Sequence, residues 1–163
     1  MADCSCTNRF EGSPAIQDQY KPKFRHCFGC GADNEAGWHV KSYLTSSTTA
    51  VAHFTPKPEY TGGVPDNLYG GIIAAIMDCH GMAAGAGFHH VNDGLVLGQD
   101  PMVRCVTAQL SVSYKKPTPM GQELTLTATL ERIEGRKVWL DITVGVGDDI
   151  TAEGKILAVR VKE

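Results

Sequence analysis

Apolar and polar residues alternate along four stretches in the second half of the chain, which is the pattern of strands buried on one face. These stretches are 106–114, 124–131, 138–146 and, less regularly, 150–161. In the first stretch Val106 and Ala108 fall on the predicted apolar face and Thr107 on the polar face. Shorter alternations over 38–45 and 48–55, joined by two serines, predict a hairpin nearer the N-terminus.

One segment between these two groups of strands predicts a helix. Residues 70–86 are almost all apolar or small, and they favour a helix of about four to five turns. A helix that is apolar on every side is buried. The flanking segments 55–69 and 88–101 predict loops, and His89–His90 in the second are expected to be solvated. This order of elements predicts an α+β fold in which an antiparallel sheet of five to six strands wraps around one long helix.

Length and composition limit the class of protein. A chain of 163 residues with 42% hydrophobic and 20% charged residues predicts one folded domain, here 26–163, preceded by a loosely held arm over 1–25 with a short helix around 15–20. The net charge of −3 argues against nucleic-acid binding. The apolar run 72–77 is too short to cross a membrane. The first residues lack the pattern of a signal peptide, so we expect a cytoplasmic location and reduced thiols.

A single acid, Asp78, lies in the middle of the predicted helix. Burying an ionised carboxylate is costly unless it is paired or hydrogen-bonded. Asp78 is therefore either a structural acid, bonded to the backbone or to His80, or a catalytic base or nucleophile. We favour catalysis because the same helix face carries mainly small residues, which leave space for a ligand or a second helix. These residues are Gly71, Ala74, Ala75, Gly81 and Met82.

The start of the helix offers a second candidate element of a reaction site. Gly70 and Gly71 would place unpaired N–H groups at the positive end of the helix dipole, where a substrate oxyanion can be stabilised. A tight turn alone would explain the same pair. Asp78 lies seven residues, or roughly 10.5 Å, beyond Gly71, so one reacting carbonyl cannot contact both groups of one chain. The spacing predicts two helices running antiparallel about a two-fold axis, in a homodimer or a dimer of dimers.

Three sequence blocks occur in a fixed order along the chain. They are CFGCGADNEAG at 27–37, YGG at 69–71 followed by Asp78, and VTAQLSVSYKKPTP at 106–119. Together they resemble the hotdog-fold acyl-CoA thioesterases of the phenylacetate-pathway type, over roughly residues 26–161. The resemblance implies an enzyme that hydrolyses an acyl-CoA thioester to a carboxylic acid and coenzyme A, with no cofactor and no metal.

The resemblance also implies roles for particular residues. Asp78 would be the general base or the nucleophile, and the sequence leaves both possibilities open. The N–H of Gly71, together with that of Gly70, would polarise the thioester carbonyl. Thr107 matches a family threonine that helps to place the attacking water.

Several further residues are candidates for binding the substrate. Tyr69 stands where the family usually has a histidine, and its phenol can still donate a hydrogen bond. Asn67 can donate to the substrate or cap a loop. Between residues 104 and 137 six cationic side chains outnumber three acidic ones, and Lys115, Lys116 and Arg136 are predicted to hold the phosphates of coenzyme A. Ordinary solvation of the strand ends would explain the same charges.

Other functions remain compatible with the sequence. The replacement of the family histidine by Tyr69 keeps open a non-catalytic acyl-CoA binding or regulatory module. A hydratase or dehydratase usually pairs an acid with a histidine, but Asp78 and His80 are two residues and therefore about 200° apart on a helix.

The cysteines allow a further alternative. Cys27 and Cys30 could bind zinc together with His26 or with the cysteines at positions 4 and 6, in a zinc-stabilised interaction protein. The family resemblance favours a packing turn at this position instead. Cys79 and Cys105 lie in apolar segments and are expected to act as small buried hydrophobic residues.

Overall fold

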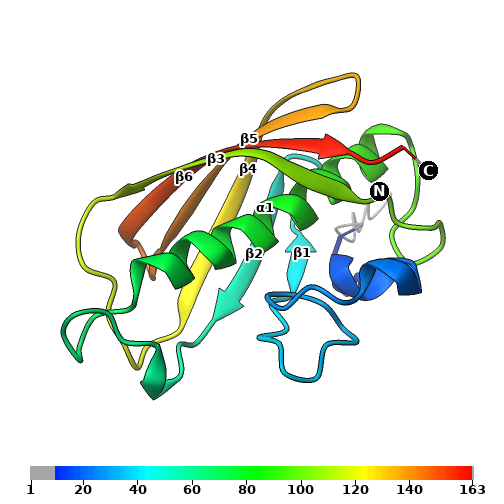
Figure 1. Cartoon of the computed structure of the whole chain (residues 1–163). Helices are drawn as coiled ribbons and strands as arrows, with labels where there is room; N and C mark the ends of the chain where they lie inside the picture. The colour runs from blue at the N-terminus through cyan, green and yellow to red at the C-terminus, as the bar shows by residue number, and fades with distance from the viewer. Residues whose placement is uncertain (1–9, 163) are drawn as a thin grey trace, which may run out of the picture.

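The chain folds as a curved antiparallel sheet around one long helix (Figure 1). The computed structural model describes residues 10–162, and the six strands follow the order β1–β2–β4–β5–β6–β3. The strands are β1 (Ser42–Leu44), β2 (Thr49–Phe54), β3 (Cys105–Tyr114), β4 (Leu124–Glu134), β5 (Lys137–Val146) and β6 (Asp149–Arg160). The helices are α1 (Gly70–Asn92) and three short 3-10 helices, η1 (Ile16–Gln19), η2 (Pro22–Phe24) and η3 (Pro58–Tyr60). The predicted α+β architecture is confirmed.

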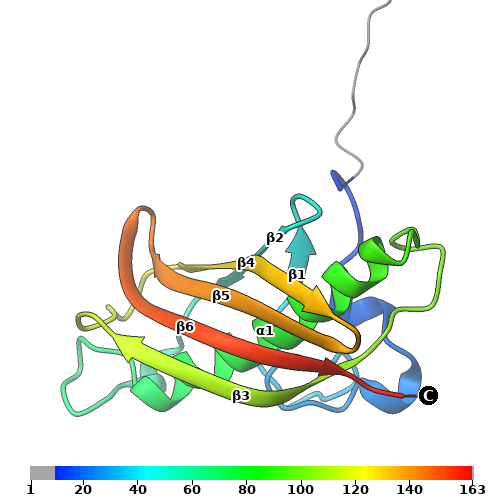
Figure 2. The ribbon, with the colours of Figure 1, turned by 90° about the horizontal axis from the view of Figure 1, so that it is seen from above.

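The core lies between α1 and the concave face of the sheet. Strand β5 shows the predicted alternation, with Val138, Leu140, Ile142 and Val144 all buried. Viewed from above, β3 forms one edge of the sheet and runs alongside α1 (Figure 2). The site discussed below is built between this edge strand and the helix.

Glycines allow α1 to approach the sheet closely. A Cβ atom at Gly81 would lie 2.3 Å from Ile156 Cδ1, and one at Gly85 would lie 3.1 Å from Ala158 Cβ. The first distance is far inside van der Waals contact, so even alanine at position 81 would force the helix or Ile156 to move. Gly81 and Gly85 therefore allow the close packing of α1 against the sheet.

Helix α1 is longer than the sequence pattern predicted. It ends at Asn92 rather than at residue 86, and the predicted loop over 88–101 begins only after it. His89 and His90 are buried within its last turns, so the expectation that they are solvated was wrong. The helix continues because this end also packs inside the protein: Phe88 is buried, and the His89 ring nitrogen lies 3.2 Å from the carbonyl oxygen of Arg136.

By length and hydropathy alone, α1 resembles a membrane-spanning segment. It has 23 residues, and 78% of its most apolar stretch is buried inside the fold. This burial is what a core helix requires, and it accounts for the apolar composition without a membrane.

A buried polar network joins the N-terminal segment to α1. Gln17 donates to Ser42 Oγ (2.9 Å), which lies 2.9 Å from His80 Nδ1, while His80 Nε2 lies 3.2 Å from the carbonyl oxygen of Ala50. All three side chains are buried, and η1 contacts both β1 and α1. The short helix expected around residues 15–20 is present, but this part of the arm is packed rather than loosely held.

The burial of the His80 ring leads us to expect that the free energy of unfolding decreases in mild acid. Burial lowers the pKa of His80 from 6.5 to about 4, so the folded protein keeps a neutral ring where the unfolded chain binds a proton. Stability from this neutral ring is fully present above pH 6.5 and falls as the pH drops towards 4, by up to about 3 kcal/mol.

Urea unfolding from about pH 7 to about pH 4.5 measures this loss. A His80→Gln variant should be less stable and should show a smaller decrease over this interval, whereas the exposed-site control His26→Gln should keep the wild-type decrease. Equal pH dependence in the wild type and His80→Gln would contradict the assignment.

Candidate active site

Asp78 lies in the middle of α1 and faces the edge strand β3. Its carboxylate accepts a hydrogen bond from Thr107 Oγ1, and Asp78 is half-buried. The prediction that α1 is buried on all sides is therefore wrong for one stripe of the helix, formed by Gly71, Ala74, Ala75 and Asp78. Gly71 is exposed, and the other three residues are only partly buried. A carboxylate that has access to water and accepts a hydrogen bond from a hydroxyl is placed where a general base could act.

A β-bulge places Thr107 beside Asp78. Strict alternation along β3 put Val106 on the apolar face and Thr107 on the polar face, and this prediction was wrong. The pairing with β6 shifts between Thr107 and Gln109, so that Thr107 pairs with Ala158 on the helix side of the sheet. Val106 is 50% exposed. Bulges re-aim side chains in this way and occur frequently next to active sites.

The start of α1 is framed by two tyrosines. The Tyr114 hydroxyl donates to the carbonyl oxygen of Gly70 at 2.8 Å. The Tyr69 ring lies over Gly71, where a Cβ atom would be 2.5 Å from Tyr69 Cζ, and Tyr69 is itself 57% exposed. Within residues 10–162 no hydrogen bond from the amides of Gly70 and Gly71 is observed. Within the described part of the chain, the N–H groups of Gly70 and Gly71 are thus free, and the exposed Tyr69 ring lies beside Gly71.

The loop before α1 uses the backbone of Asn67. Its N–H donates to the carbonyl oxygen of Val64 at 3.2 Å, and its own carbonyl oxygen accepts from the N–H of Gly62 at 2.7 Å. Asn67 also forms an isolated bridge with Pro119. These contacts all involve the backbone of Asn67, and both predictions for its side chain, a substrate donor or a loop cap, stay predictions.

The predicted site residues do not all meet within one chain. Asp78 and Thr107 are in contact, but Gly71 is about two helical turns away, roughly 10.5 Å along the same axis. The predicted cationic residues are also divided. Lys115 pairs with Glu153 at 3.2 Å, and Lys116 pairs with Asp149, close to the start of β6.

Arg136 lies at the other end of β6. It donates to the carbonyl oxygen of Arg160 at 3.1 Å, roughly 30 Å from the lysines along the strand. There it helps to line an open cavity of about 640 Å³ that carries five cationic and no acidic side chains. Of the other four, only Arg104 belongs to the cationic group counted in the sequence, because only the fold brings the remaining three to this place. The four are Lys21, Arg104, Arg160 and Lys162.

His80 is not a partner of Asp78, either in a structural hydrogen bond or in the acid–histidine pair of a hydratase. His80 points towards Ser42 and Ala50, while Asp78 is bonded to Thr107. The acid–histidine pair that a hydratase would use is therefore absent at this position.

The arrangement of sheet, central helix and mid-helix acid defines a hotdog-fold protein with a candidate hydrolytic site. The profile of the fluoroacetyl-CoA-specific thioesterase family matches residues 95–163. A thioesterase superfamily protein from Shewanella loihica is 33% identical, with a TM-score of 0.65 over 90% of this chain and 99% of that chain. The chain belongs to the hotdog-fold thioesterase superfamily, as its sequence motifs predicted.

Further relatives are consistent with this membership. The acyl-coenzyme A thioesterase THEM4 of Xenopus laevis is 28% identical over 93% of this chain, and the chain spans 61% of that relative's length. The PaaI protein of the Escherichia coli phenylacetic acid degradation operon shares the fold, with a TM-score of 0.62 over 77% of this chain and 81% of that chain at 15% identity.

Proposed function

We propose that the protein hydrolyses an acyl-CoA thioester to a carboxylic acid and coenzyme A. The observation that carries the proposal is the Asp78 carboxylate, held by Thr107 on the open stripe of α1. Asp78 accepts a proton from water, the water oxygen bonds to the thioester carbonyl carbon, and the carbon–sulfur bond then breaks. The proton passes to the sulfur, so that the thiol leaves as free coenzyme A.

A second copy of the chain completes the site in this proposal. The carbonyl oxygen needs donors about 3 Å away while the same carbonyl carbon is within reach of water on Asp78. Gly71 of the same chain is too distant, whereas an antiparallel second helix would bring its own first turn to Asp78. Strand β3 supports this pairing, because it is an edge strand with exposed apolar side chains such as Val106 and Tyr114.

Asp78→Asn is predicted to lower kcat by about 10²–10⁴-fold, because an amide cannot accept the proton of water. Release of free thiol from a panel of acyl-CoAs measures the rate. The matched control Asp141→Asn changes an exposed ion pair with Lys155 and should leave the rate unchanged. Unchanged turnover in Asp78→Asn would refute the role of the carboxylate.

Mixing two inactive variants tests the shared site. Gly71→Pro removes the proposed N–H donor in the first turn of α1 and requires the Tyr69 ring to move, and Asp78→Asn removes the base. Each variant alone should be nearly inactive. After subunit exchange, about half of the dimers are mixed and hold one intact site of two, so about a quarter of the wild-type rate should return. A mixture that stays inactive despite confirmed exchange would show that the site is not shared.

The cationic cavity is proposed to bind the phosphate groups of coenzyme A. Arg136→Gln should raise KM for acyl-CoA about tenfold, because a charge-assisted hydrogen bond is lost. KM for the matching N-acetylcysteamine thioester, which has no phosphate, should not change. Lys137→Gln, one residue along and outside the cavity, is the matched control. If Lys115→Gln and Lys116→Gln raise KM for acyl-CoA and Arg136→Gln does not, the phosphates bind at the opposite end of β6.

A non-catalytic acyl-CoA binding module is the second candidate function. It is favoured by one observation, the exposed Tyr69 ring that covers Gly71 at the start of α1. Binding of acyl-CoA without thiol release by the wild-type protein would select this alternative.

A further inference from the structure

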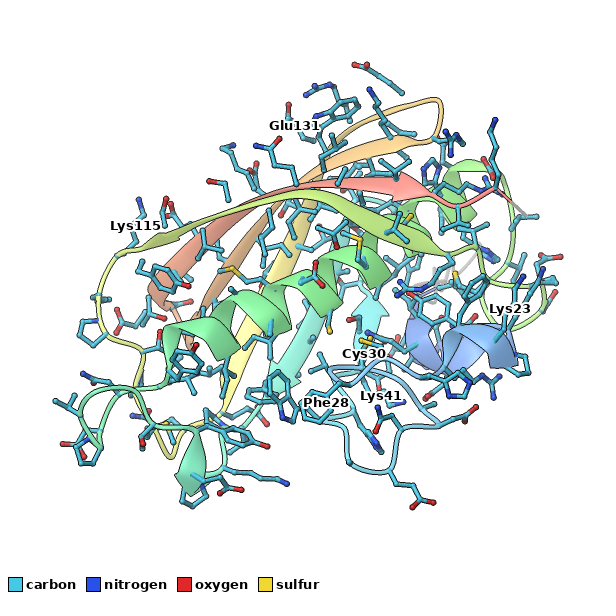
Figure 3. The ribbon with its side chains drawn as sticks, in the orientation of Figure 1. Lys23, Phe28, Cys30, Lys41, Lys115 and Glu131 are labelled. Carbon is cyan, nitrogen blue, oxygen red and sulfur yellow. The ribbon has the colours of Figure 1, made fainter. Side chains whose placement is uncertain are left out.

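Three cysteine side chains meet between the segment 27–37 and the middle of α1. Their Sγ atoms all lie within 4.8 Å of one another, and the Sγ atoms of Cys27 and Cys79 are 3.8 Å apart. Cys30 and Cys79 are buried and Cys27 is half-buried. Figure 3 shows Cys30 on the loop that passes beneath α1. Within residues 10–162 this is the one group of three metal-ligating side chains that converges in this way.

The separations match those of thiolates around one metal ion. A tetrahedral zinc site has Zn–S bonds of about 2.3 Å, which places neighbouring sulfurs roughly 3.8 Å apart. The Cys27–Cys79 distance already has this value, and the other two sulfur–sulfur distances do not exceed 4.8 Å. A disulfide would instead require the two sulfurs to approach to about 2.05 Å.

The conformation of the loop 27–37 allows Cys79 to contact it. The N–H of Gly31 donates to the carbonyl oxygen of Cys27 at 2.8 Å, which closes the turn that holds Cys27 and Cys30 together. A Cβ atom at Gly29 would lie only 2.3 Å from Cys79 Sγ, so any other residue there would displace this sulfur. The N–H of Val40 donates to the carbonyl oxygen of Gly29 at 3.0 Å and fixes the loop to the segment that leads into β1.

We propose that Cys27, Cys30 and Cys79 bind one thiophilic divalent cation, of which Zn²⁺ is the prime example. Three thiol protons are released to solvent and three sulfur–metal bonds form. These three residues supply three of the four ligands of a tetrahedral site, and water would be the fourth ligand in this proposal. The ion ties the loop to α1 at the residue next to Asp78. The proposal does not depend on the hydrolytic activity.

Cobalt titration tests the site in the full chain. Protein that has been reduced and freed of metal should bind one equivalent of Co²⁺, with a thiolate-to-cobalt charge-transfer band and the intense visible bands of a tetrahedral centre. One equivalent of Zn²⁺ should abolish these bands and raise the thermal unfolding midpoint. Cys27→Ser should weaken binding by more than about a hundredfold. Cys105→Ala removes a buried thiol outside the group and should bind as the wild type does.

Alkylation of the wild-type protein provides a measurement that does not depend on folding of a variant. Zn²⁺ should slow the reaction of half-buried Cys27 with iodoacetamide, as counted by mass spectrometry of its peptide. The proposal is overturned if the reduced protein shows no thiolate-to-cobalt band, if the band survives in Cys27→Ser, or if Zn²⁺ leaves the alkylation rate unchanged. A disulfide among these residues in protein that takes up no metal after reduction would also overturn it.

Discussion

The close contact between α1 and the sheet is the constraint on which the candidate site depends. Gly81 and Gly85 let the helix approach Ile156 and Ala158 closely, and most residues of the helix are buried. The sheet ends at β3, however, and one stripe of α1 remains partly open beside that edge. A carboxylate on this stripe has core packing on one side and access to water on the other. Asp78 occupies such a position, which suits the proposed role of a general base.

Local patterns in the sequence were sufficient for much of the fold. Alternation predicted the strands, and the apolar composition of α1 predicted a central helix, because both signals are periodic within a few residues. The β3 bulge could not be predicted in this way, because one extra residue leaves no mark in an alternating sequence. As a result, alternation placed Thr107 on the wrong face, and only the family resemblance connected it with Asp78.

Contacts between distant segments account for what sequence reasoning missed. Cys27 and Cys79 are 52 residues apart, and Ser42 and His80 are 38 apart, yet each pair meets at α1. The cationic cavity likewise gathers side chains from the segment before β3, the β4–β5 turn and the end of β6. No periodicity relates such positions. Their meeting follows from the order of the strands around the helix, which becomes known only with the structure.

Three consecutive residues of α1 face three different parts of the protein. Each step along a helix turns the side chain by about 100°. Asp78 thus faces Thr107 on β3, Cys79 faces the cysteine loop, and His80 faces Ser42 on β1. Rotation of the helix would break all of these contacts together. Each buried hydrogen bond contributes about 1 kcal/mol, and loss of one partner costs about 1–3 kcal/mol. The contacts of Cys79 and His80 therefore fix the rotation of α1 about its axis. This rotation sets the direction in which the Asp78 carboxylate faces Thr107.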